Sequence, residues 1–219
     1  MNVTTDHLFS LLVPVIRPLV VGRIGAARRR YFEGLPASPG QVVLLGDSIT
    51  EQGKWSDLFP ELRTANRGIG GESTADLLER LHCGIFQPKA VSLLIGTNDL
   101  HGPRDQRALA GITQRADEIV GRLRDELPSA VLFLNSITPR TPYFTDRIQT
   151  LNASYRDIAQ NHGAAFVDLW PTMADDAGAI HKELTKDNLH LSPAGYRAWA
   201  DVLRPHFAPF RAQALTEGD

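Results

Sequence analysis

A serine, a histidine and an aspartate stand in this sequence at positions where together they could transfer an acyl group. Ser48 directly follows a short apolar run, in the segment GDSIT, and a serine hydroxyl becomes an effective nucleophile only beside a base. His190 ends the segment DNLH, in which Asp187 precedes it by three residues. A carboxylate at this spacing can reach Nδ1 of the imidazole within one turn and fix its tautomer. The pattern predicts a nucleophile, a base and a group that orients the base.

Each of these segments also has a simpler explanation. Ser48 could be an ordinary N-cap of a helix, and Asp-x-x-His is often only a polar turn. Ser48 does not lie in a G-x-S-x-G segment, which argues against the nucleophile elbow of the α/β-hydrolases. The other histidines sit in helical or loop contexts without a carboxylate at a comparable spacing; they are His7, His82, His101, His162, His181 and His206.

Two further segments offer donors for an oxyanion, which an acyl-transfer site also needs. The glycines of Asn66–Gly71 (NRGIGG) permit a tight turn and let a backbone N–H approach a ligand closely. Asn98, in the segment GTND, can present its side-chain amide. Turn chemistry alone could explain either segment. However, three successive strand ends carry the parts of one mechanism, and this is much less expected by coincidence than any one of them alone.

The hydrophobic pattern indicates the strands that must position these residues. Continuous apolar runs are typical of parallel strands covered on both faces, and they occupy residues 41–46, 90–96, 130–137 and 164–170, with a weaker fifth candidate at 64–69. Strands that alternate with helices imply right-handed crossovers and an α/β fold, here a three-layer α/β/α sandwich. Ligands of such sheets bind beyond the carboxyl ends of the strands. The candidate residues follow strands, as this rule requires.

Helices are indicated between the strands by apolar side chains at helical spacing. Two stripes, over residues 109–127 and 148–158, predict long helices, and Gly163 is a plausible C-terminal cap for the second. Ser73 with Asp76 resembles a capping box, and Ser192 before Pro193 offers an N-cap for a last helix.

The four segments GDSIT (46–50), NRGIGG (66–71), GTND (96–99) and DNLH (187–190) resemble, in this order, the four blocks of the SGNH (GDSL-type) hydrolase family. The resemblance spans residues 41 to 207 approximately. It implies a flavodoxin-like parallel sheet of five strands in the order 2-1-3-4-5, with no metal or organic cofactor. It assigns Ser48 as nucleophile, His190 as general base and Asp187 as the orienting acid. The oxyanion hole would be formed by the N–H groups of Ser48 and Gly71 and by the side chain of Asn98.

The segment GIGG, together with Trp55 and Phe59-Pro60, is most similar to the branch that contains platelet-activating-factor acetylhydrolase catalytic subunits and acetylesterases. The resemblance therefore implies a serine esterase of small-molecule esters with short acyl chains. Lysophospholipase or acyl-thioesterase activity on longer chains stays open, as does transfer to an alcohol other than water. A non-catalytic ligand-binding module on the same fold is the alternative from another class. Asp47 and Asp99 are interpreted as loop organisers.

Composition sets further bounds. The chain has 219 residues, enough for one sizeable domain, and its 23 basic and 25 acidic side chains do not indicate a nucleic-acid partner. Cys83 is the single cysteine, so no intrachain disulfide can form. This is compatible with the reducing cytoplasm, which we expect as the location, although export or peripheral membrane association stays open.

The N-terminal region carries an apolar stripe from Leu8 to Val20 that is interrupted by Pro14 and Pro18. We expect an amphipathic helical extension over residues 1–40, a hydrolase domain over 41–210 and a loose tail over 211–219. The extension could pack on the flank of its own domain. Alternatively, residues 8–30 could contact a second copy of the chain or a membrane interface. A degenerate export signal is the third possibility.

Overall fold

The computed structural model describes residues 20–34 and 38–214. Most of the predicted apolar stripe of the extension, from Leu8 to Leu19, lies outside the described residues. The described part of the extension is helical, with a π-helix η1 (Val20–Gly25) followed by α2 (Ala26–Gly34). The division between an extension over residues 1–40 and a domain that begins at residue 41 stays a prediction.

Five strands form one parallel sheet in the order β2-β1-β3-β4-β5, as the family resemblance implied. They are β1 (Val42–Gly46), β2 (Thr64–Gly68), β3 (Ala90–Leu94), β4 (Val131–Asn135) and β5 (Ala165–Val167). The register places Gly46 opposite Gly68 on one side and Leu94 on the other. The loops that follow β1, β2 and β3 therefore start side by side at one edge of the sheet.

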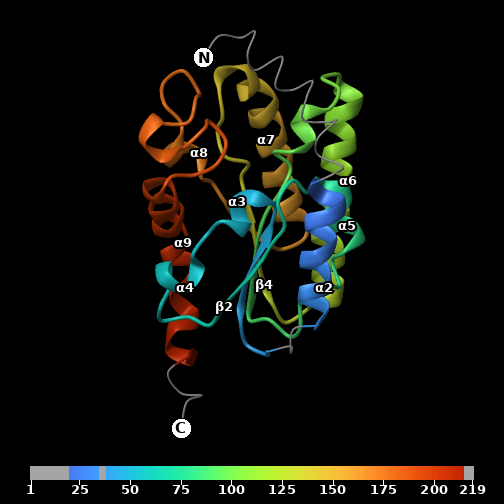
Figure 1. Cartoon of the computed structure of the whole chain (residues 1–219), viewed down its shortest axis with the longest axis vertical. Helices are drawn as coiled ribbons and strands as arrows, with labels where there is room; N and C mark the ends of the chain where they lie inside the picture. Colours follow the sequence, from blue (N-terminus) through green and yellow to red (C-terminus); the bar gives the residue numbers. More distant parts are fainter. Residues whose placement is uncertain (1–19, 35–37, 215–219) are drawn as a thin grey trace.

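Helices cover both faces of the sheet, which confirms the three-layer sandwich (Figure 1). Successive side chains of β1 alternate between the faces, as they must in a strand. Val43 and Leu45 join the core under α5 (Thr74–Glu79), α6 (Gln106–Glu126) and α7 (Thr145–Asn161). Val42 and Leu44 join the core under α4 (Trp55–Leu58), α8 (Trp170–Met173) and α9 (Pro193–Ala214). Short helices complete the chain: α3 (Ser48–Glu51), η2 (Asp99–His101), η3 (Pro142–Phe144) and η4 (Lys182–Leu184).

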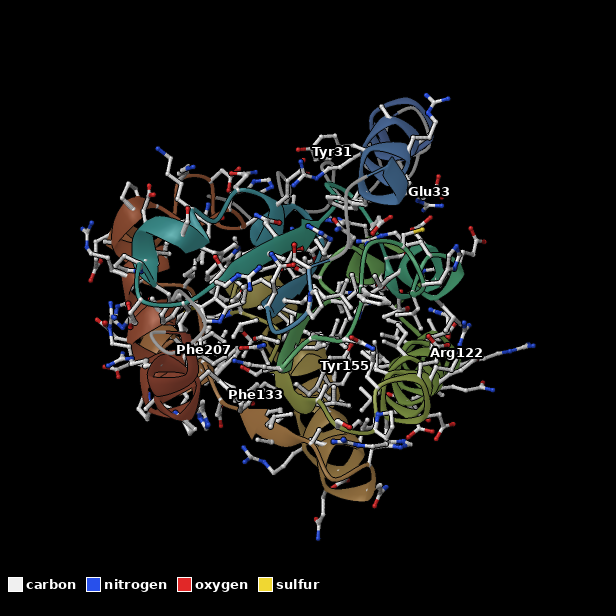
Figure 2. The ribbon with its side chains drawn as sticks, turned by 90° about the horizontal axis from the view of Figure 1, so that it is seen from below. Tyr31, Glu33, Arg122, Phe133, Tyr155 and Phe207 are labelled. Carbon is white, nitrogen blue, oxygen red and sulfur yellow. The ribbon has the colours of Figure 1, made fainter. Side chains whose placement is uncertain are left out.

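The two cores are visible when the sheet is seen along its strands (Figure 2). Phe133 of β4 and Phe207 of α9 meet on one side of the sheet, with ring centroids 5.5 Å apart. Tyr155 of α7 lies on the other side, fully buried, and its hydroxyl donates to the carbonyl of Ile95 at 3.2 Å. Each face thus has aromatic groups packed against the strands.

The predicted caps are present. Ser73 and Asp76 form a capping box at the start of α5, and Ser192 directly precedes α9, which begins at Pro193. Gly163 follows α7 with a φ of +62°, the left-handed conformation that favours glycine.

Two predicted boundaries are wrong. The apolar run 164–170 is not all strand, because β5 ends at Val167 and Asp168 accepts a hydrogen bond from the N–H of Trp170, which begins α8. The loose tail does not begin at residue 211, because α9 continues to Ala214 and Arg211 forms an ion pair with Glu61 at 2.9 Å. Leu169 belongs to the apolar run although it is not in a strand, because its side chain is fully buried in the core under α9.

Within the described ranges 20–34 and 38–214, no helix has the length and apolar character needed to cross a membrane.

Candidate active site

Ser48 is the first residue of α3 and is separated from the end of β1 by a single residue, Asp47. The helix cap is Asp47, whose side chain accepts a hydrogen bond from the N–H of Ile49 at 2.9 Å. The simpler explanation of Ser48 as an N-cap is therefore wrong. Tyr196 of α9 fixes this helix from the other side by donating its hydroxyl to the carbonyl of Ile49 at 2.7 Å. The hydroxyl of Ser48 is left for another contact.

That contact is with His190. The distance from Oγ of Ser48 to Nε2 of His190 is 3.0 Å, and Nδ1 of the same ring lies 2.8 Å from Oδ2 of Asp187. In this arrangement each ring nitrogen of His190 has one oxygen partner, Nε2 the hydroxyl of Ser48 and Nδ1 the carboxylate of Asp187. An imidazole held in this way can accept a proton at Nε2 while Nδ1–H stays bonded to the carboxylate.

Asp187 is held in place by its own loop. Its Oδ1 accepts the backbone N–H groups of Leu189 and His190 at 3.1 and 2.7 Å. The turn between them is tight, with Asn188 at a φ of +65°, and the loop is closed by pairing of Thr185 with Leu191. Partial burial would raise the pKa of Asp187, but the hydrogen bonds from the His190 ring and backbone hold it below its usual value. The carboxylate is therefore ionised where the imidazole needs it.

The glycine-rich loop after β2 approaches Ser48 closely. Gly68 has no room for a side chain, since a Cβ there would lie 2.2 Å from the backbone nitrogen of Glu51. Gly71 has a φ of +79°, in the region that favours glycine. Between them, Gly70 donates its N–H to Glu51 at 2.5 Å, and a Cβ on Gly70 would lie 3.8 Å from Cβ of Ser48. The loop thus sets its backbone beside the serine.

Asn98 follows β3 and is largely buried. One of its two amide hydrogens is directed at the carbonyl of Glu72, with Nδ2 and the oxygen 2.9 Å apart. This bond fixes the amide plane and leaves the second hydrogen of the same nitrogen as a donor.

A buried ion pair supports the loop after β2 and the loop after β3. Sequence reasoning missed this pair. Glu72 and Arg80 are fully buried and 2.6 Å apart. Arg80 also donates to the carbonyls of Gly46 and Arg67, and Arg29 of α2 reaches Glu72 at 3.1 Å. Charged residues usually lie on the surface. Only the position of Arg80, one turn after the apolar Leu77 in α5, could have suggested that it points inward.

The two aspartates beside the candidate residues have structural contacts. Asp99 accepts hydrogen bonds from the N–H and the hydroxyl of Thr74 at 2.9 and 2.6 Å, and it pairs with Arg115. Asp47 is completely buried, and its Oδ2 has no hydrogen-bond partner within the described part of the chain. Burial raises the pKa of Asp47 to about 7, against a smaller opposing effect of the hydrogen bond from Ile49.

A cavity of about 540 Å³ opens beside Asn98, between η2 and α6. Its walls carry several ionisable side chains; they include Asp99, His101, Asp105, Arg107 and Arg115. A second cavity of about 390 Å³ is lined by Lys186, the residue before Asp187, together with Lys54, Asp57 and Arg197. The cavity beside Asn98 thus carries several charged groups, whereas the one beside Lys186 also has apolar walls, formed by Leu58, Pro193 and Tyr196.

Residues 44–198 match the family of GDSL-like lipases and acylhydrolases. The chain belongs to this family. Among the relatives of this GDSL-like hydrolase, platelet-activating factor acetylhydrolase IB subunit alpha1 of Pongo abelii is 30% identical over 208 residues, which cover 90% of this chain and 88% of the relative. The corresponding alpha2 subunit of Rattus norvegicus is 26% identical over 176 residues, 75% of this chain and 73% of the relative.

Solved structures agree with this assignment. A protein from Streptococcus pneumonia, described provisionally as a platelet activating factor, has a TM-score of 0.74 at 26% identity, covering 94% of this chain and 99% of its own. An acetyl-xylooligosaccharide esterase from Geobacillus has a TM-score of 0.63 at 20% identity, covering 77% and 94%, and shares the fold. The GDSL-like hydrolase is a carboxylic ester hydrolase.

The structure brings together the residues that the sequence singled out. Ser48, His190 and Asp187 are in mutual contact. Gly71 and Asn98 lie on the loops after β2 and β3, at the same edge of the sheet. Their catalytic roles stay predictions.

Proposed function

We propose that this GDSL-like hydrolase cleaves esters of short acyl chains through an acyl-enzyme on Ser48. The observation that carries the proposal is the chain of contacts from Oγ of Ser48 to Nε2 of His190, and from Nδ1 of His190 to Asp187. Both distances, 3.0 and 2.8 Å, are within hydrogen-bond reach, so a proton can move along the first bond while the second holds the ring.

In the first step His190 takes the proton of Ser48 as Oγ attacks the ester carbonyl. Negative charge develops on the carbonyl oxygen, and the N–H groups of Ser48 and Gly71 and the amide of Asn98 are its donors. Asp187, ionised, stabilises the imidazolium that has formed. His190 then gives its proton to the leaving alcohol, and the acyl group stays on Ser48.

In the second step water replaces the alcohol. His190 removes a proton from the water as its oxygen attacks the acyl carbonyl, and the same donors hold the second oxyanion. Collapse of this intermediate breaks the bond to Oγ, which recovers its proton from His190. The carboxylic acid leaves and the enzyme is restored, so the cycle needs no metal or organic cofactor.

The preference for a short acyl chain rests on the relatives named as acetylhydrolases and on the lining of the cavity beside Asn98. A long acyl chain is bound by predominantly apolar walls, because transfer of each methylene from water to such walls contributes about 0.8 kcal/mol. The cavity beside Asn98 instead carries charged side chains, among them Asp105, Arg107 and Arg115. The relatives named as acetylhydrolases support the same preference.

A series of p-nitrophenyl esters from acetyl to palmitoyl tests the chain length. We expect kcat/KM to be highest for acetyl or propionyl and to fall steadily beyond butyryl. A maximum at octanoyl or longer would favour lysophospholipase or acyl-thioesterase activity instead. Product analysis with an added sugar alcohol separates hydrolysis from transfer, since transfer would yield the acetylated alcohol rather than acetate alone.

A further inference from the structure

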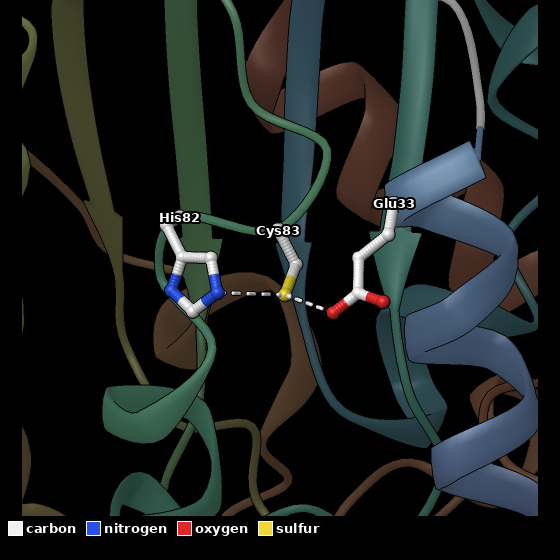
Figure 3. Close-up of side chains that lie close together, drawn as sticks. All are labelled: Glu33, His82 and Cys83. Carbon is white, nitrogen blue, oxygen red and sulfur yellow. Dashed lines mark hydrogen bonds between the residues drawn. The ribbon is translucent and has the colours of Figure 1, made fainter.

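A second cluster of side chains, of types that can bind a metal ion, lies apart from the residues around Ser48. Glu33 at the end of α2 meets His82 and Cys83 in the loop after α5 (Figure 3). One ligand atom of each side chain lies within 4.8 Å of the other two. The proposed reaction uses none of the three.

The two distances from Sγ of Cys83 to the other donors match those of a tetrahedral zinc site. Sγ of Cys83 lies 3.5 Å from Nε2 of His82 and 3.6 Å from Oε1 of Glu33. Zinc binds sulfur at about 2.3 Å and nitrogen or oxygen at about 2.0–2.2 Å, so tetrahedral angles place these donor atoms about 3.5 Å apart. In Figure 3 the imidazole and the carboxylate approach the sulfur from opposite sides. To surround one ion, the donors of His82 and Glu33 must move closer to each other, which these two exposed side chains can do by rotation.

Burial in the cluster is suited to a metal ligand set. Cys83 is buried, and its backbone is fixed by a hydrogen bond to the carbonyl of Arg80 and by one from Arg67 to the neighbouring Gly84. Glu33 and His82 are exposed. An ion can therefore enter from solvent between two adaptable side chains and meet a sulfur that is already in place.

The donor types select the metal. A thiolate, a neutral imidazole and a carboxylate suit zinc, whereas magnesium and calcium prefer oxygen ligands only. One thiolate and one carboxylate also balance the charge of a divalent ion. On binding, the S–H bond of Cys83 gives its proton to solvent and the freed electron pair forms the zinc–sulfur bond.

We propose that Glu33, His82 and Cys83 bind one Zn²⁺ ion, with a water molecule in the fourth position. The ion joins the last turn of α2 to the loop after α5. Arg29 lies one turn before Glu33 on the same face of α2 and pairs with Glu72 of the glycine-rich loop. The proposed ion would thus fix the C-terminal end of α2, and the middle of the same helix, through Arg29, contacts Glu72 beside the active site.

Metal titration of the untagged, reduced, full-length chain tests the proposal. Zinc affinity is measured by competition with a chromophoric chelator, and Co²⁺ is used as a spectroscopic probe. We expect one equivalent of Zn²⁺ and a thiolate-to-cobalt charge-transfer band in the near ultraviolet. Cys83→Ser removes the band. Cys83→Ser, His82→Gln and Glu33→Gln each weaken zinc binding by at least about tenfold.

Two matched variants serve as controls. Glu118→Gln changes an exposed glutamate of α6, and His162→Gln changes a histidine that already contacts a carboxylate, Asp117, at 2.9 Å. Both keep the zinc affinity and the cobalt band of the wild type. The melting temperature rises with free zinc in the wild type and in both controls, and does not rise in Cys83→Ser.

The proposal is wrong if the wild-type chain binds no zinc, or if its cobalt complex lacks the thiolate band. It is equally wrong if Cys83→Ser binds zinc as tightly as the wild type. Far-ultraviolet circular dichroism verifies that each variant is folded, which is expected because serine replaces cysteine with little change of volume and the other two side chains are exposed. Esterase activity is not a readout, so the result is independent of the proposed reaction.

Discussion

At the scale of single residues, the candidate site consists of the contacts from Ser48 through His190 to Asp187, next to the completely buried carboxyl of Asp47. The spacing of three residues between Asp187 and His190 predicts their contact, and the position of Ser48 after a strand of the same sheet predicts that it lies at the same site. The burial of Asp47 could not be predicted, because an aspartate beside a serine looks like any polar turn. Its burial depends on strands that are distant in the sequence, since the end of β1 lies between Gly68 of β2 and Leu94 of β3, and no local pattern encodes this arrangement.

Asn98→Ala tests the oxyanion donor. The substitution removes an amide that would stabilise charge only in the transition state, so we expect kcat to fall roughly 10²–10³-fold with little change in KM. Asn161→Ala, at the exposed end of α7, is the matched control and should retain full activity. Steady-state kinetics with p-nitrophenyl acetate measure both. A loss confined to KM would show that Asn98 binds the ground state instead.

Asp47→Asn tests the buried carboxyl through the pH dependence of stability. Because the pKa of Asp47 is raised to about 7 in the folded chain, the folded state binds more protons than the unfolded state between about pH 4 and pH 7. Stability contributed by the neutral acid is therefore lost as the pH rises through this window, by about 1.4 kcal/mol for each unit of pKa shift. Asparagine caps helices well and cannot ionise.

We expect Asp47→Asn to be more stable than the wild type at pH 8, with the difference shrinking towards pH 5. Urea unfolding across this range measures it, and the exposed Asp125→Asn serves as control, with no such trend. A constant difference between Asp47→Asn and the wild type at all pH values would contradict the raised pKa.

At the scale of elements, the long helices and the strands were predictable, whereas the short helices were not. α6 and α7 span several turns, so their apolar stripes repeat often enough to be recognised. α3 and α8 have four residues each, too few for any period to appear. Asp47 caps α3, and at the start of α8 Asp168 accepts a hydrogen bond from the N–H of Trp170.

Glu72→Gln tests the buried ion pair that joins these elements. Removing the charge leaves Arg80 buried without its carboxylate, which costs roughly 3–5 kcal/mol of unfolding free energy. Glu126→Gln removes the exposed pair with Arg122 and should cost less than about 1 kcal/mol. Equilibrium unfolding in urea compares the two. Equal small effects would mean that the Glu72–Arg80 pair does not support the loops.

At the scale of the whole molecule, the sandwich depends on a helix that extends past the family match. The match ends at residue 198, while α9 continues to Ala214 and carries Leu203 and Phe207 into the second core. The strand order followed from the family resemblance, since strand patterns alone do not fix which strands are neighbours. The length of α9 did not, because Pro205 and Pro209 lie inside it and proline normally ends a helix.

Phe207→Ala tests the contribution of this last part of α9. The ring is fully buried against Phe59 and Phe133, so its removal leaves a cavity and should cost roughly 3–5 kcal/mol. Phe86→Ala removes an exposed ring and should change stability by less than about 0.5 kcal/mol. Thermal and urea unfolding distinguish the two outcomes. A mild effect of Phe207→Ala would mean that the sandwich is complete without the end of α9.

The central claim, that Ser48 carries the acyl group, is tested most directly by locating the covalent adduct. Wild-type protein is treated with a fluorophosphonate and the modified peptide is identified by mass spectrometry, alongside Ser48→Ala. We predict a single adduct on Ser48 with loss of activity, no adduct in Ser48→Ala, and a kcat for that variant lower by roughly 10⁶-fold. An adduct on another residue, or unchanged turnover of p-nitrophenyl acetate by Ser48→Ala, would contradict the account.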